Sequence, residues 1–94
     1  MFEILVRPHA LRQLRRLRRV DMVAILDALD RYLRQEPDRP TGTRIKRLRG
    51  QQDATYRLRV GAYRIFYDIA EEVVTVVAVL HKRDTRAFYR GEHP

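Results

Sequence analysis

Apolar and polar side chains alternate strictly along two short stretches of the chain, residues 56–60 and 63–67. Alternation with a period of two residues is typical of a β-strand that buries one face. Between the stretches, Gly61-Ala62 suits a two-residue type II′ turn, in which glycine takes the first central position. The pattern therefore predicts a tight β-hairpin over about residues 55–69.

The register of this hairpin predicts one apolar face and one cationic face. A two-residue turn pairs Val60 with Tyr63 and Arg59 with Arg64. The apolar face then holds Tyr56, Leu58, Val60, Tyr63, Ile65 and Tyr67, and the cationic face holds Arg57, Arg59 and Arg64. Two arginines directly opposite each other repel. We therefore expect an anion to bind at the cationic face.

The chain before the hairpin is predicted to form a strand and two helices. Alternation over residues 2–7 indicates a strand, which Pro8 ends. Leucines that recur every three residues indicate a helix over residues 9–19. A second apolar stripe indicates another helix, with Asp21 as its N-cap and an end near Glu36. The short connection between the helices predicts an antiparallel helical hairpin.

A long apolar strand is predicted after the hairpin, at residues 73–81, following a turn at Glu71-Glu72. Pairing Ala70 with Val73 predicts a core face of Val74, Val76, Ala78 and Leu80, and places Thr75, Val77, Val79 and His81 on the arginine face. The other predicted features are an extended segment at 43–48, a turn at 50–53, and a short final helix that Asp84 caps and Gly91 ends.

These elements predict one α+β domain over residues 1–94, in the order β-α-α-β-β-β-α. The N-terminal strand and the αα-hairpin would pack on a small, mostly antiparallel sheet in a two-layer arrangement.

The charge of the chain points to a polyanionic partner. The net charge is +8, and all but two of the 20 basic residues are arginine, whose planar fork binds phosphate oxygens in pairs. Residues 7–19 hold six arginines and no acid, and residues 44–64 hold seven basic residues and one acid. Such clustering favours nucleic acid as the partner, over a solvated surface or an acidic protein.

Several site types find no support in the sequence. There is no cysteine, which excludes disulfides and thiolate metal sites and fits a cytoplasmic location. No apolar run approaches the roughly 20 residues that span a membrane, and no signal peptide is visible. Without a carboxylate pair, a metal-binding histidine pair or a glycine-rich phosphate loop, we expect neither a metal nor a nucleotide cofactor, and no membrane partner.

Three ordered segments resemble the RelE/ParE toxin superfamily of bacterial type II toxin–antitoxin systems, most of all its RelE branch. They are Arg47-Leu-Arg-Gly50, residues 56–67, and His81-Lys-Arg-Asp84 with Tyr89. The resemblance implies a toxin that enters the ribosome and cleaves mRNA without a metal, by attack of the 2′-hydroxyl on the neighbouring phosphate. It also implies a cognate, RelB-like antitoxin, and the ribosome and mRNA as partners.

Site residues follow from the resemblance position by position. Arg57 and Arg59 match the basic residues before the hairpin turn, Arg64 the arginine after it, Arg83 the arginine after the last strand, and Tyr89 the tyrosine of the final helix. The resemblance thus implies Arg59, Arg64, Arg83 and Tyr89 as catalytic residues, and as RNA contacts Lys46, Arg47, Arg49, Arg57, Lys82 and Arg86. Arg12, Arg15, Arg16, Arg18 and Arg19 would contact ribosomal RNA or merely be solvated.

One departure from the family bears on the chemistry. The residues before the turn are lysine in typical members, and here they are arginine, which keeps its proton near neutrality. Arg57 or Arg59 would hold a phosphate but would be a poor general base. His81 is the nearby group that titrates near neutrality, so it joins the catalytic candidates as a base or acid.

Two other functions stay open on the sequence alone. A ParE-like protein would inhibit DNA gyrase by binding it, without chemistry of its own, and would not require the cluster of Arg59, Arg64, Arg83 and Tyr89. A degenerate toxin would only bind its antitoxin.

Overall fold

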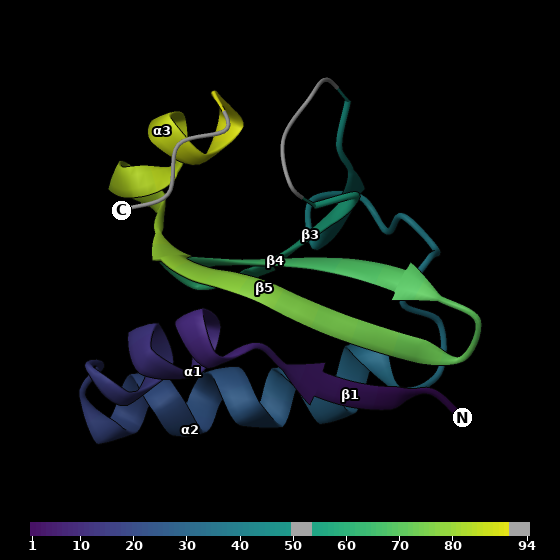
Figure 1. The fold of residues 1–94 in the computed structure, drawn as a ribbon, viewed down its shortest axis with the longest axis horizontal. Helices are drawn as coiled ribbons and strands as arrows, with labels where there is room; N and C mark the ends of the chain where they lie inside the picture. Colours follow the sequence, from purple (N-terminus) through teal and green to yellow (C-terminus); the bar gives the residue numbers. More distant parts are fainter. Residues whose placement is uncertain (50–53, 91–94) are drawn as a thin grey trace.

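The structure is a computed structural model that describes residues 1–49 and 54–90 (Figure 1). Its elements are β1 (Glu3–Val6), α1 (Pro8–Arg15), α2 (Arg19–Ala28) continued by the π-helical turn η1 (Leu29–Leu33), β2 (Ile45–Arg47), β3 (Tyr56–Val60), β4 (Tyr63–Ala70), β5 (Val73–His81), the 3₁₀ turn η2 (Lys82–Asp84) and α3 (Thr85–Tyr89). No helix among the described residues is long and apolar enough to cross a membrane.

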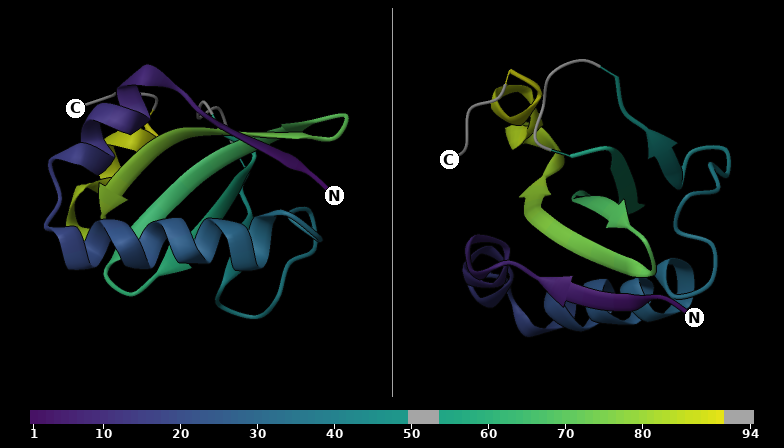
Figure 2. Two further views of the ribbon diagram at one scale, coloured as in Figure 1. Left: turned by 90° about the horizontal axis from the view of Figure 1, so that it is seen from below. Right: turned by 45° about the vertical axis from the view of Figure 1, so that its right-hand side comes forward.

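The strands form one sheet in the order β1-β5-β4-β3-β2. Strand β1 runs parallel to β5, and every other pair is antiparallel. Helices α1 and α2 cover one face of this sheet, and α3 lies over the opposite face (Figures 1 and 2). The predicted α+β fold is confirmed. The short edge strand β2, within the segment expected to be extended, adds one strand to the predicted order.

The main core lies between α1, α2 and the sheet. Its helical contribution is Ala10, Leu14, Ile25, Ala28, Leu29 and Leu33, and its strand contribution is Ile45, Tyr56, Leu58, Ile65, Tyr67, Val74, Val76 and Val79. Full burial of one such aliphatic side chain stabilises the fold by roughly 1.5–3 kcal/mol. Ile25, Leu29 and Leu33 of the predicted stripe dock the second helix on this face, whereas Leu26, predicted in the same stripe, is 43% exposed.

The predicted hairpin register is confirmed. Val60 pairs with Tyr63, and Arg59 pairs with Arg64. Gly61 has a φ of +56°, whereas Ala62 is not among the residues with positive φ. A turn with positive φ at its first central residue alone favours glycine there, as the sequence predicted.

The predicted faces of β5 are wrong beyond its midpoint. The register with β4 shifts between Phe66 and Tyr67, so that Phe66 pairs with Ala78 and Tyr67 with Val76. Val77 is the extra residue of this bulge, and a bulge exchanges the two faces for all residues that follow it. Val79 therefore joins the main core, although it was predicted on the arginine face.

The same shift moves three other side chains to faces opposite those predicted. Ala78 and Leu80, expected in the main core, instead join a second apolar cluster on the opposite face. That second cluster consists of Ala54, Phe66, Val77, Ala78, Leu80 and Phe88, with Leu48 packed against it. His81, expected on the arginine face, pairs with Tyr63 on the side of the main core.

Two helix boundaries also differ from prediction. Helix α1 ends at Arg15 rather than Arg19, and Arg18, not Asp21, is the N-cap of α2. Asp21 lies in the first turn of α2, where its carboxylate is 3.5 Å from Arg18 Nε. Asp84 occupies the N-cap position of α3 without a side-chain cap bond, as part of η2. The predicted turn at 50–53 and the Gly91 end lie outside the described residues.

Candidate RNA-binding face

The arginines of the hairpin lie on the sheet face that α3 shares. Arg57 pairs with Phe66, and Phe66 stacks on Phe88 of α3 with ring centroids 4.1 Å apart. On the next strand, Lys46 pairs with Arg57. We call Lys46, Arg57, Arg59 and Arg64 the cationic cluster. Three strands thus deliver four positive charges to one surface, because cross-strand neighbours share a face.

Arg64 lies at the centre of the electrostatic repulsion in this cluster. Partial burial lowers its pKa, the positive charges of Arg57 and Arg59 lower it further, and Tyr89 opposes them. Its Nη1 donates hydrogen bonds to the carbonyl oxygens of Gly61 and Tyr63, at 3.0 and 2.9 Å. These bonds fix the guanidinium beside the turn, so its charge cannot move far from its neighbours.

On this face, the side chain of Arg57 has a hydrogen-bond donor that no described residue satisfies. Its Nε is buried and has no hydrogen-bond partner among the described residues. A buried donor without a partner costs about 1–3 kcal/mol, and more when the group is charged. Within residues 1–49 and 54–90, no carboxylate pairs with Arg57, Arg59 or Arg64. An anion bound here would satisfy the donor and relieve the repulsion together.

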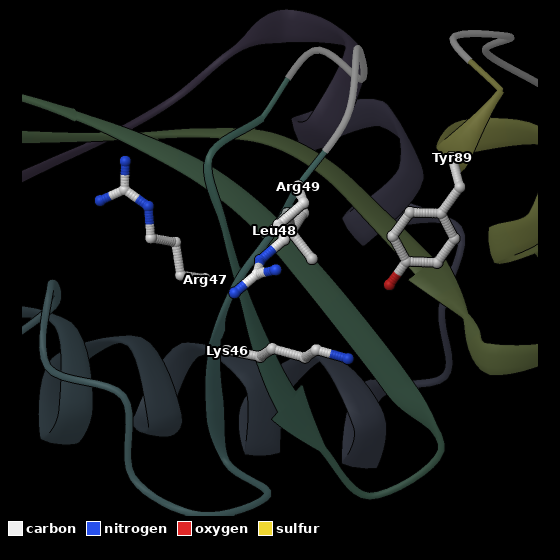
Figure 3. A pocket seen from close by; sticks show the side chains of 5 residues that line it. All are labelled: Lys46, Arg47, Leu48, Arg49 and Tyr89. Carbon is white, nitrogen blue, oxygen red and sulfur yellow. The ribbon is translucent and has the colours of Figure 1, made fainter.

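Tyr89 lies over the second apolar cluster at the rim of the cationic cluster. Its ring meets Phe66 edge-on at 5.7 Å and Phe88 at 6.5 Å, and 39% of the residue stays exposed. It lines an open hollow of about 520 Å³ together with Lys46, Arg47, Leu48 and Arg49. Figure 3 shows the Tyr89 hydroxyl directed toward the β2 side of the hollow. The hollow therefore combines an aromatic ring with the positive charges of Lys46 and Arg49.

Arg47 and Arg49 differ in what surrounds them. The Arg47 guanidinium points away from the hollow (Figure 3) and lies 5.7 Å from the Tyr56 ring, where Nη1 donates to the Tyr56 hydroxyl at 3.4 Å. Arg47 contributes mainly to packing on the side of the main core. Arg49 is exposed and lines the hollow, and its role as an RNA contact stays a prediction.

The basic residues after β5 lie outside the cationic cluster. Arg83 and Arg86 line a separate hollow of about 280 Å³ with Asp84, Ala87 and Arg90. The Arg83 side chain is 75% exposed, and its Nε is 3.9 Å from the Asp84 carboxylate. Its positive charge acts on the pKa of Tyr63, whereas it is not among the groups that shift the pKa of Arg64. Lys82 is also exposed.

His81 lies in a polar chain on the opposite face. Its ring meets Tyr63 edge-on at 5.5 Å, and its Nδ1 accepts a hydrogen bond from the Arg83 backbone N–H at 3.2 Å. The Tyr63 hydroxyl donates to the Asp21 carboxylate at 3.1 Å, and burial, then Asp21, raises the pKa of Tyr63. His81 thus caps η2 and links it to α2 through Tyr63.

Two contributors to the candidate site were not singled out from the sequence. Leu48 and Phe88 form the apolar support on which Tyr89 rests. The role of Phe88 could have been inferred from the sequence, because adjacent aromatic residues in a helix point in different directions. In the five-residue helix α3, one ring is buried and the next is exposed. Leu48 has no such signal, because its position depends on the pairing of a three-residue edge strand.

Known structures share this fold. The chain is 27% identical to a chain of the RelBE2 toxin–antitoxin complex from Mycobacterium tuberculosis, with a TM-score of 0.69 over 85% of this chain and 96% of that chain. It is 22% identical to a chain of the archaeal RelE–RelB complex from Pyrococcus horikoshii (TM-score 0.71; 88% and 97%) and 15% identical to the YoeB dimer of Staphylococcus aureus (TM-score 0.55; 82% and 92%). No curated protein sequence matches the chain.

A sequence family provides the remaining comparison. The model of the family described as the ParE toxin of the type II toxin–antitoxin system parDE matches residues 4–86. That span includes β1 except for Glu3, all the other strands, α1, α2 and the whole cationic cluster. The chain therefore belongs to the ParE toxin family, within the RelE/ParE superfamily of type II toxin–antitoxin toxins.

Proposed function

We propose that this toxin is a ribosome-dependent endoribonuclease that cleaves mRNA at the cationic cluster and is neutralised by a RelB-like antitoxin. The observation that carries the proposal is the buried Nε of Arg57, which has no partner within residues 1–49 and 54–90, beside the facing pair Arg59 and Arg64. A scissile phosphate is an anion of suitable charge for this position. The exposed ring of Tyr89 is a surface on which an unpaired base can stack, as single-stranded RNA recognition requires.

The reaction consistent with this site is an internal transesterification. The 2′-oxygen attacks the adjacent phosphorus, the bond from phosphorus to the 5′-oxygen breaks, and a 2′,3′-cyclic phosphate forms. The proton of the 2′-hydroxyl leaves the attacking oxygen, and the departing 5′-oxygen gains one. Negative charge accumulates on the phosphate oxygens in the transition state, and fixed positive groups stabilise it there.

The cluster supplies charge rather than a proton acceptor. Arginine keeps its proton near neutrality, so Arg57, Arg59 and Arg64 act as clamps in this proposal. His81 lies on the opposite sheet face, beside Tyr63, and is therefore no longer our candidate for the base. We assign proton acceptance to water or to ribosomal groups, in agreement with a toxin that acts only on the ribosome.

The test is cleavage of mRNA on programmed ribosomes by the purified protein. We expect the wild type to cut mRNA in the ribosomal A site, and Arg64→Ala to lose most of this activity while remaining folded. Arg31→Ala is the matched control, because Arg31 is an exposed arginine of η1 that pairs with Asp27 at 3.7 Å, in the helical layer on the opposite side of the sheet. Intact mRNA after incubation with the wild type would refute the proposal.

A second function, inhibition of DNA gyrase, is favoured by the family match to ParE toxins. In that case the cationic cluster would bind gyrase or its DNA without bond cleavage. A supercoiling assay separates the two functions: gyrase inhibition with intact mRNA selects the second. A protein that forms a complex with its antitoxin but shows neither activity would be a toxin that only binds.

A further inference from the structure

Helix α1 presents an arginine surface that the proposed reaction does not use. Arg12, Arg15 and Arg16 are exposed along α1 and its C-cap, and Arg19 is exposed at the start of α2. Residues 7–19 contain six arginines and no acid, so no carboxylate within this segment can neutralise them. In the described residues, none of these four arginines forms an ion pair.

In contrast to α1, the exposed arginines at the end of the second helix have acidic partners. Arg31 lies 3.7 Å from Asp27, and Arg34 lies 2.6 Å from Asp30, each one helical turn away. On α1, the residues one turn apart are Arg12 and Arg16, which repel. Both helices cover the same sheet face, so exposure to solvent alone does not explain the difference.

The helix dipole accounts for only part of this charge. Arg12 and Arg15 lie in the last turn of α1, where the dipole favours cations. A helix end carries about half of a negative elementary charge, which is much less than the charge of the three arginines there. Most of the positive potential on α1 therefore remains uncompensated by the fold.

A hollow with a fixed polar wall lies within this arginine surface. His9, Arg12, Gln13 and Arg16 line a volume of about 310 Å³. Gln13 is held in place because its Oε1 accepts a hydrogen bond from the Val79 backbone N–H at 2.7 Å. The two arginines therefore flank a side chain that is anchored to β5, and the geometry of the hollow is set by the sheet.

We propose that this α1 surface binds the sugar–phosphate backbone of duplex RNA, as a contact separate from the cationic cluster. Helix α1 lies on one side of the sheet and α3 on the other, so the two surfaces face different parts of a bound partner (Figures 1 and 2). Residues 7–19 contain no exposed ring on which an unpaired base could stack, since they lack Phe, Tyr and Trp and His9 is partly buried. A helix with arginines but no such ring suits phosphates of paired RNA, which is recognised mainly through its backbone.

The choice of RNA over DNA rests on the proposed function, whereas the binding of a phosphate backbone rests on the charge of α1 alone. The probe is a fluorescein-labelled RNA duplex of about 20 base pairs and arbitrary sequence, followed by fluorescence anisotropy over a range of salt concentrations. We compare the wild type with Arg12→Ala/Arg16→Ala, which shortens two exposed arginines on a helix that tolerates alanine.

We expect the α1 double variant to weaken duplex binding by about tenfold at about 0.1 M salt. The slope of log Kd against log salt should fall by about one to two, because each lost phosphate contact removes roughly 0.9 of slope. The control Arg31→Ala/Arg39→Ala removes the same net charge from arginines that have acidic partners, and should change Kd by less than about threefold. Arg64→Ala should retain duplex binding while losing cleavage, which separates this proposal from the proposed function.

Three results would overturn the inference. Equal losses in the α1 variant and the control would mean that net charge alone governs binding. Unchanged RNA binding with weakened binding of a glutamate-rich peptide would make α1 a docking surface for an acidic protein. A loss confined to a DNA duplex of the same sequence would assign the surface to DNA.

Discussion

Buried polar groups on the two faces of the sheet differ in whether they have hydrogen-bond partners. On the α1 and α2 face, the hydroxyl of Tyr67 is fully buried and donates to the Pro37 carbonyl at 2.6 Å, and burial raises the pKa of this tyrosine. On the α3 face, Arg57 keeps a buried donor without a partner among the described residues, and Arg59 faces Arg64.

Under the proposed function, the two faces of this small domain assign stability and binding to different residues. Strand β3 shows it within three residues, since Leu58 is fully buried in the main core while Arg57 and Arg59 point to the other face. A substitution on the first face should change the free energy of unfolding, and one on the second should change activity. The following predictions test that separation, from the largest expected effect to the smallest.

The largest effect is expected from Arg64→Ala. Removal of this fixed charge should lower the rate of mRNA cleavage on ribosomes by about 10²-fold or more, the size reported for loss of one stabilising group at a developing oxyanion. The melting temperature should stay equal or rise, because the repulsion with Arg57 and Arg59 is relieved. A variant that unfolds instead would show that both faces contribute to stability.

Leu58→Ala is the counterpart on the other face of the same hairpin. Leu58 is fully buried, and removal of a buried leucine side chain costs about 2–5 kcal/mol of unfolding free energy. Denaturation with urea measures this loss, and the neighbouring Arg59→Ala is the control, with an expected change below about 0.5 kcal/mol. Similar losses in both variants would contradict the separation.

Tyr67→Phe tests a single polar contact in the main core. The variant keeps the ring, which stacks on Tyr56 at 5.6 Å, but leaves the Pro37 carbonyl without its hydroxyl donor. We expect a loss of about 1–3 kcal/mol in the free energy of unfolding and no change in cleavage per folded molecule. Reduced cleavage by fully folded protein would show coupling between the faces.

Sulfate should stabilise the wild type through Arg57. At a sulfate concentration ten times Kd, binding to the folded state adds about 1.4 kcal/mol, which is a rise of several degrees in melting temperature. Arg57→Met should lose this increment. Arg31→Met keeps it, and corrects for the general effect of sulfate on protein stability. An equal response in all three proteins would argue against an anion site at Arg57.

The smallest effect is expected from His81→Asn. Asparagine can accept the hydrogen bond from the Arg83 backbone at the same cap position, so η2 should persist. We expect cleavage within about threefold of the wild type, with the same dependence on pH between about 6 and 8. A changed pH profile would instead identify His81 as a proton-transfer group.

The hairpin could be predicted residue by residue because two local signals agree. Alternation defines the faces of β3 and β4, and Gly61-Ala62 fixes the register between them. The placement of Arg57, Arg59 and Arg64 on one surface follows directly. The contribution of Lys46 could not follow, because β2 is a three-residue strand whose pairing with β3 is not local in sequence.

The bulge in β5 could not be predicted, for a different reason. Residues 76–80 are apolar without exception, so a shift of one residue exchanges the faces without burying a polar group. Both faces of this part of β5 are covered, one by α1 and the other by α3, and hydrophobic pattern alone cannot distinguish them. The position of His81 depended on this choice.

That single extra residue at Val77 determines what kind of chemistry the α3 face can offer. If Val77 paired with Phe66 without a bulge, every later residue of β5 would change face, so that Leu80 would enter the main core and His81 would lie on the α3 face with Arg64. The face would then hold an imidazole that exchanges protons at physiological pH, next to the arginines. In the natural chain, the bulge instead places Leu80 opposite Arg64. In the proposed reaction, the bulge in this one strand thus decides whether the surface would carry its own proton acceptor or rely on one from the ribosome.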